Sequence, residues 1–175
     1  MAITTLDGII AGMQPPQDFI KVGGTMEAAG VMHSLFYTTG KPGAAATPSP
    51  GINGAALTTY AGQIPFANPV SGNTYLTSYS GAATVIGTLL LVDRLWQNSG
   101  VAVATTTAQA ITSPTWPARD NNGATSGAGV LVGIEASGAT TNVGAVSNTT
   151  LNYTNSAGGN PRTGTLTWPA TAAAG

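Results

Sequence analysis

The sequence has no cysteine and very few charged side chains. Five basic residues, six acidic residues and one histidine occur in 175 residues, and the net charge is −1. Without cysteine, disulfide frameworks, cysteine–zinc sites and thiol catalysis are excluded. Five scattered basic residues give no electrostatic footprint for a nucleic acid, and no apolar run is long enough for a membrane span. We therefore expect neither a nucleic acid nor a membrane as a partner.

The scarcity of titratable groups also disfavours an enzyme, because acid–base catalysis needs such groups paired in a pocket. The alternative is a β-sandwich hydrolase that uses Asp93, Asp120 or Glu135. It would require two carboxylates that converge in one cleft. We expect no catalytic residue, no cofactor and no metal.

The low charge makes a prediction about the surface. A free soluble protein normally keeps a charged surface of mixed sign, which resists association. This chain has an ordinary apolar content of 42% but only 6% charged residues. We therefore expect its surface to be covered by copies of itself or by partner proteins.

The N-terminal residues predict a short helical arm over 1–16. Apolar side chains recur at i, i+3, i+4 and i+7, at Leu6, Ile9, Ile10 and Met13. Thr4 or Thr5 is suited to cap this helix, and Gly12 with the following proline pair is suited to end it. Two interpretations stay open: the helix packs on its own domain, or it docks on a neighbouring subunit.

Residues 17–175 predict an all-β domain. Short stretches rich in β-formers are separated by Gly, Asn and Pro turns, which is typical of a β-sandwich or barrel-like fold, with a jelly-roll-like arrangement as one form. The predicted strands are 18–22, 31–38, 73–80, 84–96, 101–112, 130–135, 143–153 and 163–168. The 84–96 and 130–135 stretches are apolar enough to indicate buried strands.

Residues 39–72 interrupt this pattern as a long Pro/Gly-rich loop or arm. Five prolines remove backbone donors, and no strand or helix period survives. The stretch nevertheless carries apolar anchors that a solvated linker would not need, including Ile52, Leu57, Tyr60, Ile64 and Phe66. It is either an extended arm on another surface or a long ordered loop on its own domain.

Two further sites stand out by their charge. Asp93 and Arg94 are adjacent in an apolar stretch, so their side chains should face opposite sides and each needs its own partner, for which Arg119 and Asp120 are available. Residues 120–123 read Asp-Asn-Asn-Gly and predict a β-turn. They lack the EF-hand spacing, because glycine is fourth and the twelfth position is Leu131.

Four longer stretches carry a resemblance. They are MAITTLDGIIAGMQPP, LTTYAGQIPFANPVSGNTYL, GTLLLVDRLWQNSG and WPARDNNGATSGAGVLVGIE. The sequence resembles a family of virion structural proteins of tailed bacteriophages and prophages. This resemblance implies an assembly component that is located in the virion and assembled in the bacterial cytoplasm, and it transfers no catalytic signature.

The resulting expectation is a capsid decoration or cement protein. Its partners would be itself, the major capsid protein or other virion proteins. The expected contact residues form two sets: Leu6, Ile9, Ile10 and Met13 on the helix, and Ile52, Tyr60, Ile64 and Phe66 on the long loop. The alternative is a tail, collar or fibre component with a host-adhesive role, which an exposed cluster of Tyr75, Tyr79 and Tyr153 would favour.

Overall fold

A computed structural model shows an open, mostly non-helical chain with small antiparallel sheets and one short α-helix. It describes residues 3–23, 32–66, 74–102, 105–136, 138 and 143–168. Strands make up 16% and helices 7% of these residues, so loops form most of the molecule. The elements are α1 (Leu6–Gly12), β1 (Ile20–Lys21), the 3-10 helix η1 (Leu35–Tyr37), β2 (Gly40–Lys41), β3 (Ala55–Ala56), β4 (Trp96–Gln97), β5 (Val146–Tyr153) and β6 (Arg162–Trp168).

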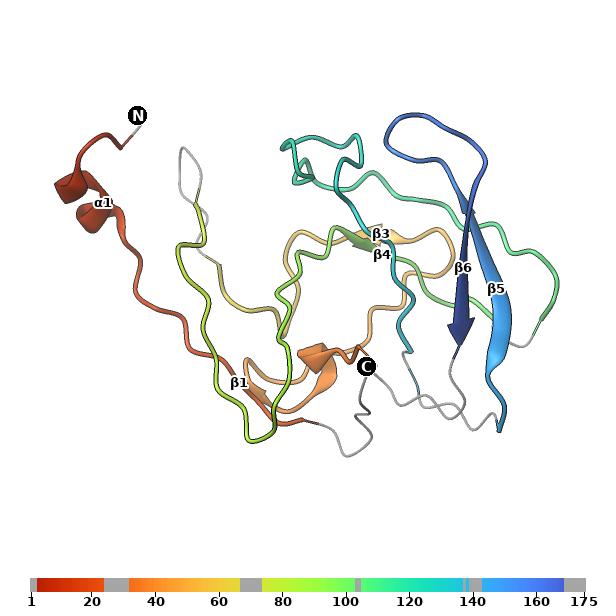
Figure 1. Cartoon of the computed structure of the whole chain (residues 1–175), viewed down its shortest axis with the longest axis horizontal. Helices are drawn as coiled ribbons and strands as arrows, with labels where there is room; N and C mark the ends of the chain where they lie inside the picture. The colour runs from red at the N-terminus through yellow and green to blue at the C-terminus, as the bar shows by residue number, and fades with distance from the viewer. Residues whose placement is uncertain are drawn as a thin grey trace.

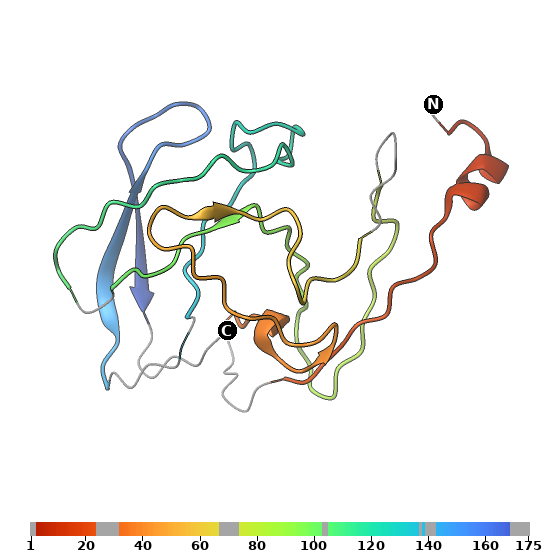
Figure 2. The ribbon, with the colours of Figure 1, turned by 180° about the vertical axis from the view of Figure 1, so that it is seen from behind.

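The strands form three separate two-stranded ribbons, β1–β2, β3–β4 and β5–β6. Figure 1 shows α1 at one end of the molecule, the β5–β6 ribbon at the other and β3–β4 between them. The same order is seen from behind in Figure 2. Neither a sandwich nor a barrel is present among the described residues, so the all-β prediction holds only at the level of small antiparallel sheets.

The predicted N-terminal helix is confirmed. The side chain of Thr5 accepts a hydrogen bond from the Gly8 N–H at 3.1 Å, and Asp7 lies in the first turn, where the helix dipole favours a negative charge. The backbone becomes extended at Met13, so the helix ends before the proline pair. α1 stands away from the remaining elements in both views of the ribbon.

The β5–β6 hairpin confirms the two C-terminal strand predictions. Its register pairs Thr150 with Thr165 and Leu151 with Gly164, with an irregularity near Asn148, whose φ is 61°. Because side chains alternate across a strand, one face carries Leu151 and the other carries threonine and asparagine. On that polar face the Thr163 hydroxyl donates to the side-chain oxygen of Asn152 at 2.9 Å.

Two strand predictions in the first half of the chain are corrected. Within 31–38, of which residue 31 lies outside the described residues, Leu35–Tyr37 forms a 3-10 turn, because the Ser34 hydroxyl accepts from the Phe36 N–H and caps it. Within 73–80, the described residues 74–80 are irregular. In 18–22 only Ile20–Lys21 pairs, with β2.

The predicted strands 84–96, 101–112 and 130–135 are also wrong for most of their length. Trp96 alone of these residues enters a described ladder, and residues 103–104 lie outside the described part. Ile86 and Leu131 are almost fully exposed, not buried. The physical reason is that a continuous apolar run becomes a buried strand only with neighbours on both edges and cover on both faces. The described chain supplies neither.

Hydrogen bonds join the long loop to β4 and the residues after it near the centre of the molecule; we call this group, around Asn98, the polar clamp. β3 pairs with β4, and the Asn98 side chain donates to the carbonyls of Ile52 and Thr112 at 2.8 and 2.7 Å. Gly54 sits in this clamp with φ of 69°, where a β-carbon would lie 2.5 Å from the Asn98 amide nitrogen. Much of the described part of 39–72 therefore packs on its own chain.

Candidate assembly interface

The chain exposes far more surface than a compact protein of its size. Its accessible surface is 12,887 Å², whereas a folded monomer of 17.3 kDa exposes about 7,800 Å². The buried apolar residues among those described are Ala45, Leu95, Ala136 and Trp168. The excess of about 5,000 Å² is several times the roughly 800 Å² that one partner buries in a standard interface.

The first predicted contact set, on the N-terminal helix, is exposed to solvent. Three of its residues lie on α1 and one directly after it, and all four are between 50% and 71% exposed: Leu6, Ile9, Ile10 and Met13. The backbone of α1 projects from the rest of the described chain (Figure 1). A helix of this length is marginal in water unless its apolar face is covered.

The second predicted contact set is divided by the structure. Ile52 and Phe66 are 43% and 49% exposed, whereas Tyr60 and Ile64 are half-buried. The Tyr60 ring lies 5.9 Å from the ring of Phe36, so it packs partly on its own chain. Ile52 and Phe66 are therefore the members of this set that are available to a partner.

Sequence reasoning missed the largest exposed apolar stretch. Every large apolar side chain of residues 85–92 is exposed: Val85, Ile86, Leu89, Leu90, Leu91 and Val92. The apolar run was visible in the sequence, but it was interpreted as a strand buried within its own domain. The low charge of the whole chain was the signal that such a run could instead be covered by another subunit.

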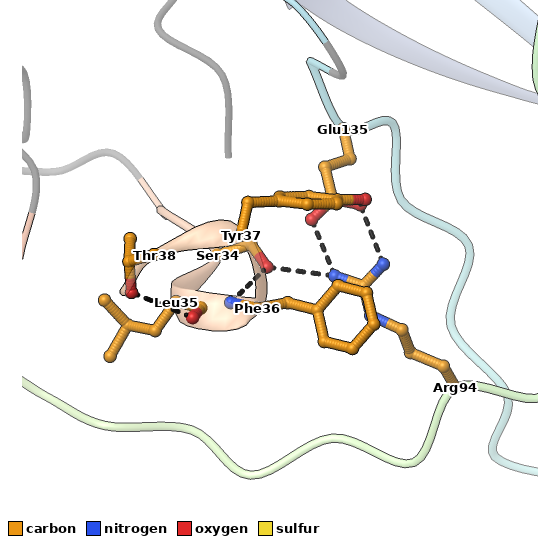
Figure 3. Close-up of polar contacts among 7 residues, drawn as sticks. All are labelled: Ser34, Leu35, Phe36, Tyr37, Thr38, Arg94 and Glu135. Carbon is orange, nitrogen blue, oxygen red and sulfur yellow. Dashed lines mark hydrogen bonds and ion pairs between the residues drawn. The ribbon is translucent and has the colours of Figure 1, made fainter. Parts of the chain in front are cut away.

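A charged cluster fixes the residues that follow this stretch. Arg94 donates to both carboxylate oxygens of Glu135, at 2.6 and 2.8 Å, and to the Ser34 hydroxyl at 3.0 Å (Figure 3). The Tyr37 hydroxyl donates to the same carboxylate at 3.0 Å, and the guanidinium lies 4.7 Å from the centre of the Phe36 ring. One arginine thus joins three segments distant in sequence.

The electrostatics of this cluster favour the ionised pair. Burial alone would raise the pKa of Glu135, but the hydrogen bonds and charge of Arg94 outweigh it and hold that pKa below its ordinary value. Burial and the neighbouring Glu135 carboxylate raise the pKa of Tyr37. The cluster therefore serves to fix the chain, with its donors and acceptors directed at one another.

The partner predicted for Asp93 is confirmed. Arg119 binds its carboxylate through two hydrogen bonds, at 2.8 and 2.9 Å, and also donates to the Leu57 carbonyl at 3.0 Å. The partner of Arg94 was not among those considered, since Glu135 lies 41 residues away and no local pattern marks it.

The predicted turn at 120–123 is also confirmed. The Gly123 N–H donates to the Asp120 carbonyl at 2.8 Å, and Gly123 has φ of 69°. The Asp120 carboxylate accepts from three backbone N–H groups and one hydroxyl, those of Asn122, Ala124, Gly127 and Ser126. The Ala124 N–H is the largest cause that lowers the pKa of Asp120 to about 2.

The structure also places residues that belong to the two alternatives, the hydrolase and the host-adhesive component. Asp93, Asp120 and Glu135 are engaged in three separate interactions and share no partner. Tyr79 stacks on Phe19, with ring centres 5.8 Å apart. Tyr153 is the last residue of β5 and is 44% exposed.

The described residues contain no group of three or more histidine or carboxylate residues that could hold a metal. None of their helices is long and apolar enough to cross a membrane. Comparison of the chain with protein-family models, with curated proteins and with solved structures gave no match.

Proposed function

We propose that the chain is a bacteriophage virion structural protein, and specifically a decoration or cement protein that stabilises the capsid through contacts between subunits. The observation that carries the proposal is the exposure of two apolar faces of the described chain, the N-terminal contact set and residues 85–92. The family resemblance of the sequence supplies the virion setting. In this role the protein acts by binding alone, without catalytic residue, cofactor or metal.

The chemistry of the exposed faces supports association with protein surfaces. The α1 face and residues 85–92 are apolar, and no charged residue lies within 85–92. Four of the eleven charged residues are paired with one another in two ion pairs, Asp93–Arg119 and Arg94–Glu135. Apolar faces that lack charge gain free energy when they leave water and pay little desolvation penalty.

Under this proposal, a sandwich or barrel would form between subunits and not within one chain. In the assembly, strands from neighbouring subunits complete the small ribbons of one chain into larger sheets with a shared apolar interior. Arms and edge strands that pair between subunits are a general way to lock symmetric assemblies.

Cryo-electron microscopy of the intact particle at side-chain resolution tests this function. We expect density for the chain on the outer shell at junctions between capsid subunits, with α1 crossing to a neighbour. Density confined to the neck, tail or fibres would reject the decoration role and favour the connector or adhesion alternative. Absence of the chain from purified particles would reject both.

A further inference from the structure

Residues 85–92 have the composition of a central strand and no strand partner. The stretch reads Val-Ile-Gly-Thr-Leu-Leu-Leu-Val, without proline or charge. The backbone groups of residues 76–93 make no hydrogen bond within the described part of the chain. Apolar side chains on both faces suit a strand with neighbours on both edges, so this segment lacks both its ladder and its cover.

The β5–β6 ribbon, in contrast, has strands but lacks a third strand among the described residues. Its two strands pair only with each other among the described residues, so both outer edges carry open backbone donors and acceptors. An isolated two-stranded ribbon is marginally stable, and a third strand over an apolar face is the usual remedy. An open edge is also a template for pairing with another chain.

The chain does not bring these two features together within itself. The segment that leads into β4 and the β5–β6 ribbon lie apart in both ribbon views (Figures 1 and 2). Residues Asp93 and Arg94, which directly follow the segment, are fixed to Arg119 and Glu135. The chain is therefore anchored directly after the apolar segment, at Asp93 and Arg94.

We propose that residues 85–92 of one copy add as a β-strand to an open edge of the β5–β6 ribbon in a neighbouring copy. The inference rests on the assembly part of the proposed function. We assign the partner as a second copy because every copy carries both a donor and an acceptor of similar length. The donor is the eight-residue apolar segment, and the acceptor is a ribbon whose strands are eight and seven residues long. Such a head-to-tail exchange closes into a ring when the rotation between copies allows it.

The exposed surface agrees with this occupant. One strand exchange gives every copy two new interfaces, one as donor and one as acceptor. All six large apolar side chains of residues 85–92 are exposed in the described chain, so the donor face is available for this contact. The donor stretch has no charge, and the ribbon strands carry a single charged residue, Arg162, at the start of β6.

A matched pair of proline variants of the full chain tests the pairing. Thr88 lies in the middle of the donor segment, whereas Ala83 precedes it, and neither residue has a hydrogen bond within the described part of the chain. Proline removes one backbone donor, holds φ at about −65° and is depleted in strands, so it disturbs pairing in the middle of the segment. We expect Thr88→Pro to weaken self-association at least about tenfold by light scattering, and Ala83→Pro to leave it nearly unchanged.

Engineered cysteines then identify the acceptor. Because the chain has no native cysteine, each introduced thiol is unique. A chain with Thr88→Cys is mixed with a chain that carries Thr150→Cys on β5 or Thr165→Cys on β6, and then oxidised. Disulfides form only where backbones approach within about 7 Å. We expect the mixed dimer of the Thr88 variant with one of the two ribbon variants.

The outcomes separate this inference from the function on which it rests. If the chain assembles but Thr88→Cys cross-links only to itself, or Thr88→Pro assembles as well as Ala83→Pro, the strand exchange is rejected while assembly stands. A chain that stays monomeric at every concentration overturns both the exchange and the self-assembly. The particle density described above then decides the virion role separately.

Discussion

Arg94 is bonded to two parts of the described chain that lie far from it in sequence. Its guanidinium reaches Glu135 and Ser34 and lies over Phe36, and its side chain is 27% exposed. Arginine suits this position because its planar fork binds a carboxylate through two bonds and can also stack on a ring. Lysine could not reproduce both contacts.

Loss of this side chain should therefore destabilise the protein. We expect Arg94→Leu to lower the free energy of unfolding by about 1–3 kcal/mol, because the largely buried Glu135 carboxylate keeps its charge and loses its partner. Urea unfolding followed by tryptophan fluorescence measures the change. Arg119→Leu is the matched control at the more exposed ion pair, with an expected loss of about 0–1 kcal/mol. Equal losses in the two variants would contradict the special role of Arg94.

Asp120 predicts a pH dependence of the 120–127 loop. Its pKa is lowered from 3.8 to about 2 in the folded chain, first by the Ala124 N–H. A lowered folded pKa means that the carboxylate contributes its stabilisation fully above about pH 4 and loses it as the pH falls toward 2. We expect wild type to lose more stability between pH 4 and 2 than Asp120→Asn. Equal acid sensitivity would show that these hydrogen bonds do not hold the loop.

At the scale of elements, α1 is an arm whose apolar face has no cover within the described chain. Ile10 lies on that face and is 58% exposed, whereas Gln17 is an exposed polar residue just beyond the arm. We expect Ile10→Asp to weaken assembly about tenfold or more, since it places a charge in an apolar contact. Gln17→Asp adds the same charge outside that contact and should have little effect.

Circular dichroism and sedimentation of both variants check this prediction. The far-ultraviolet spectrum should keep its β component in each, because α1 supports no described strand. If Ile10→Asp assembles like wild type, the arm does not dock on a neighbour.

The elements that the sequence predicted well are those with local causes. A cap at Thr5, a turn at Asp120 and the alternation of β5 and β6 depend on residues within a few positions of one another. The failures have non-local causes. No sequence pattern near Arg94 indicates that Glu135 is its partner. No pattern near residues 84–96 indicates whether a strand partner lies in the same chain.

The contact sets show the same division. Residues on α1 were identified because a helical period displays a single apolar face. Tyr60 was placed in the contact set as well, but its half-buried ring lies close to Phe36, which a loop without periodicity could not indicate. The apolar run at 85–92 is visible in the sequence, but the described chain has it neither as a strand nor buried.

At the scale of the whole molecule, low charge should make assembly insensitive to salt. The exposed faces are apolar, and the chain has only five basic and six acidic residues. Screening affects charge–charge contacts and leaves apolar contacts nearly unchanged. We expect the self-association constant to change by less than about threefold between low and high salt. A steep fall with added salt, measured by sedimentation equilibrium, would mean that charged residues drive the contacts.

The central claim is that the large apolar surface of this chain is buried between copies. Size-exclusion chromatography with multi-angle light scattering over a wide range of concentration tests it most directly. We predict a defined species of several chains at micromolar concentration that persists on dilution, because each copy can bury several standard interfaces. A monodisperse 17.3 kDa monomer at high concentration would contradict the claim.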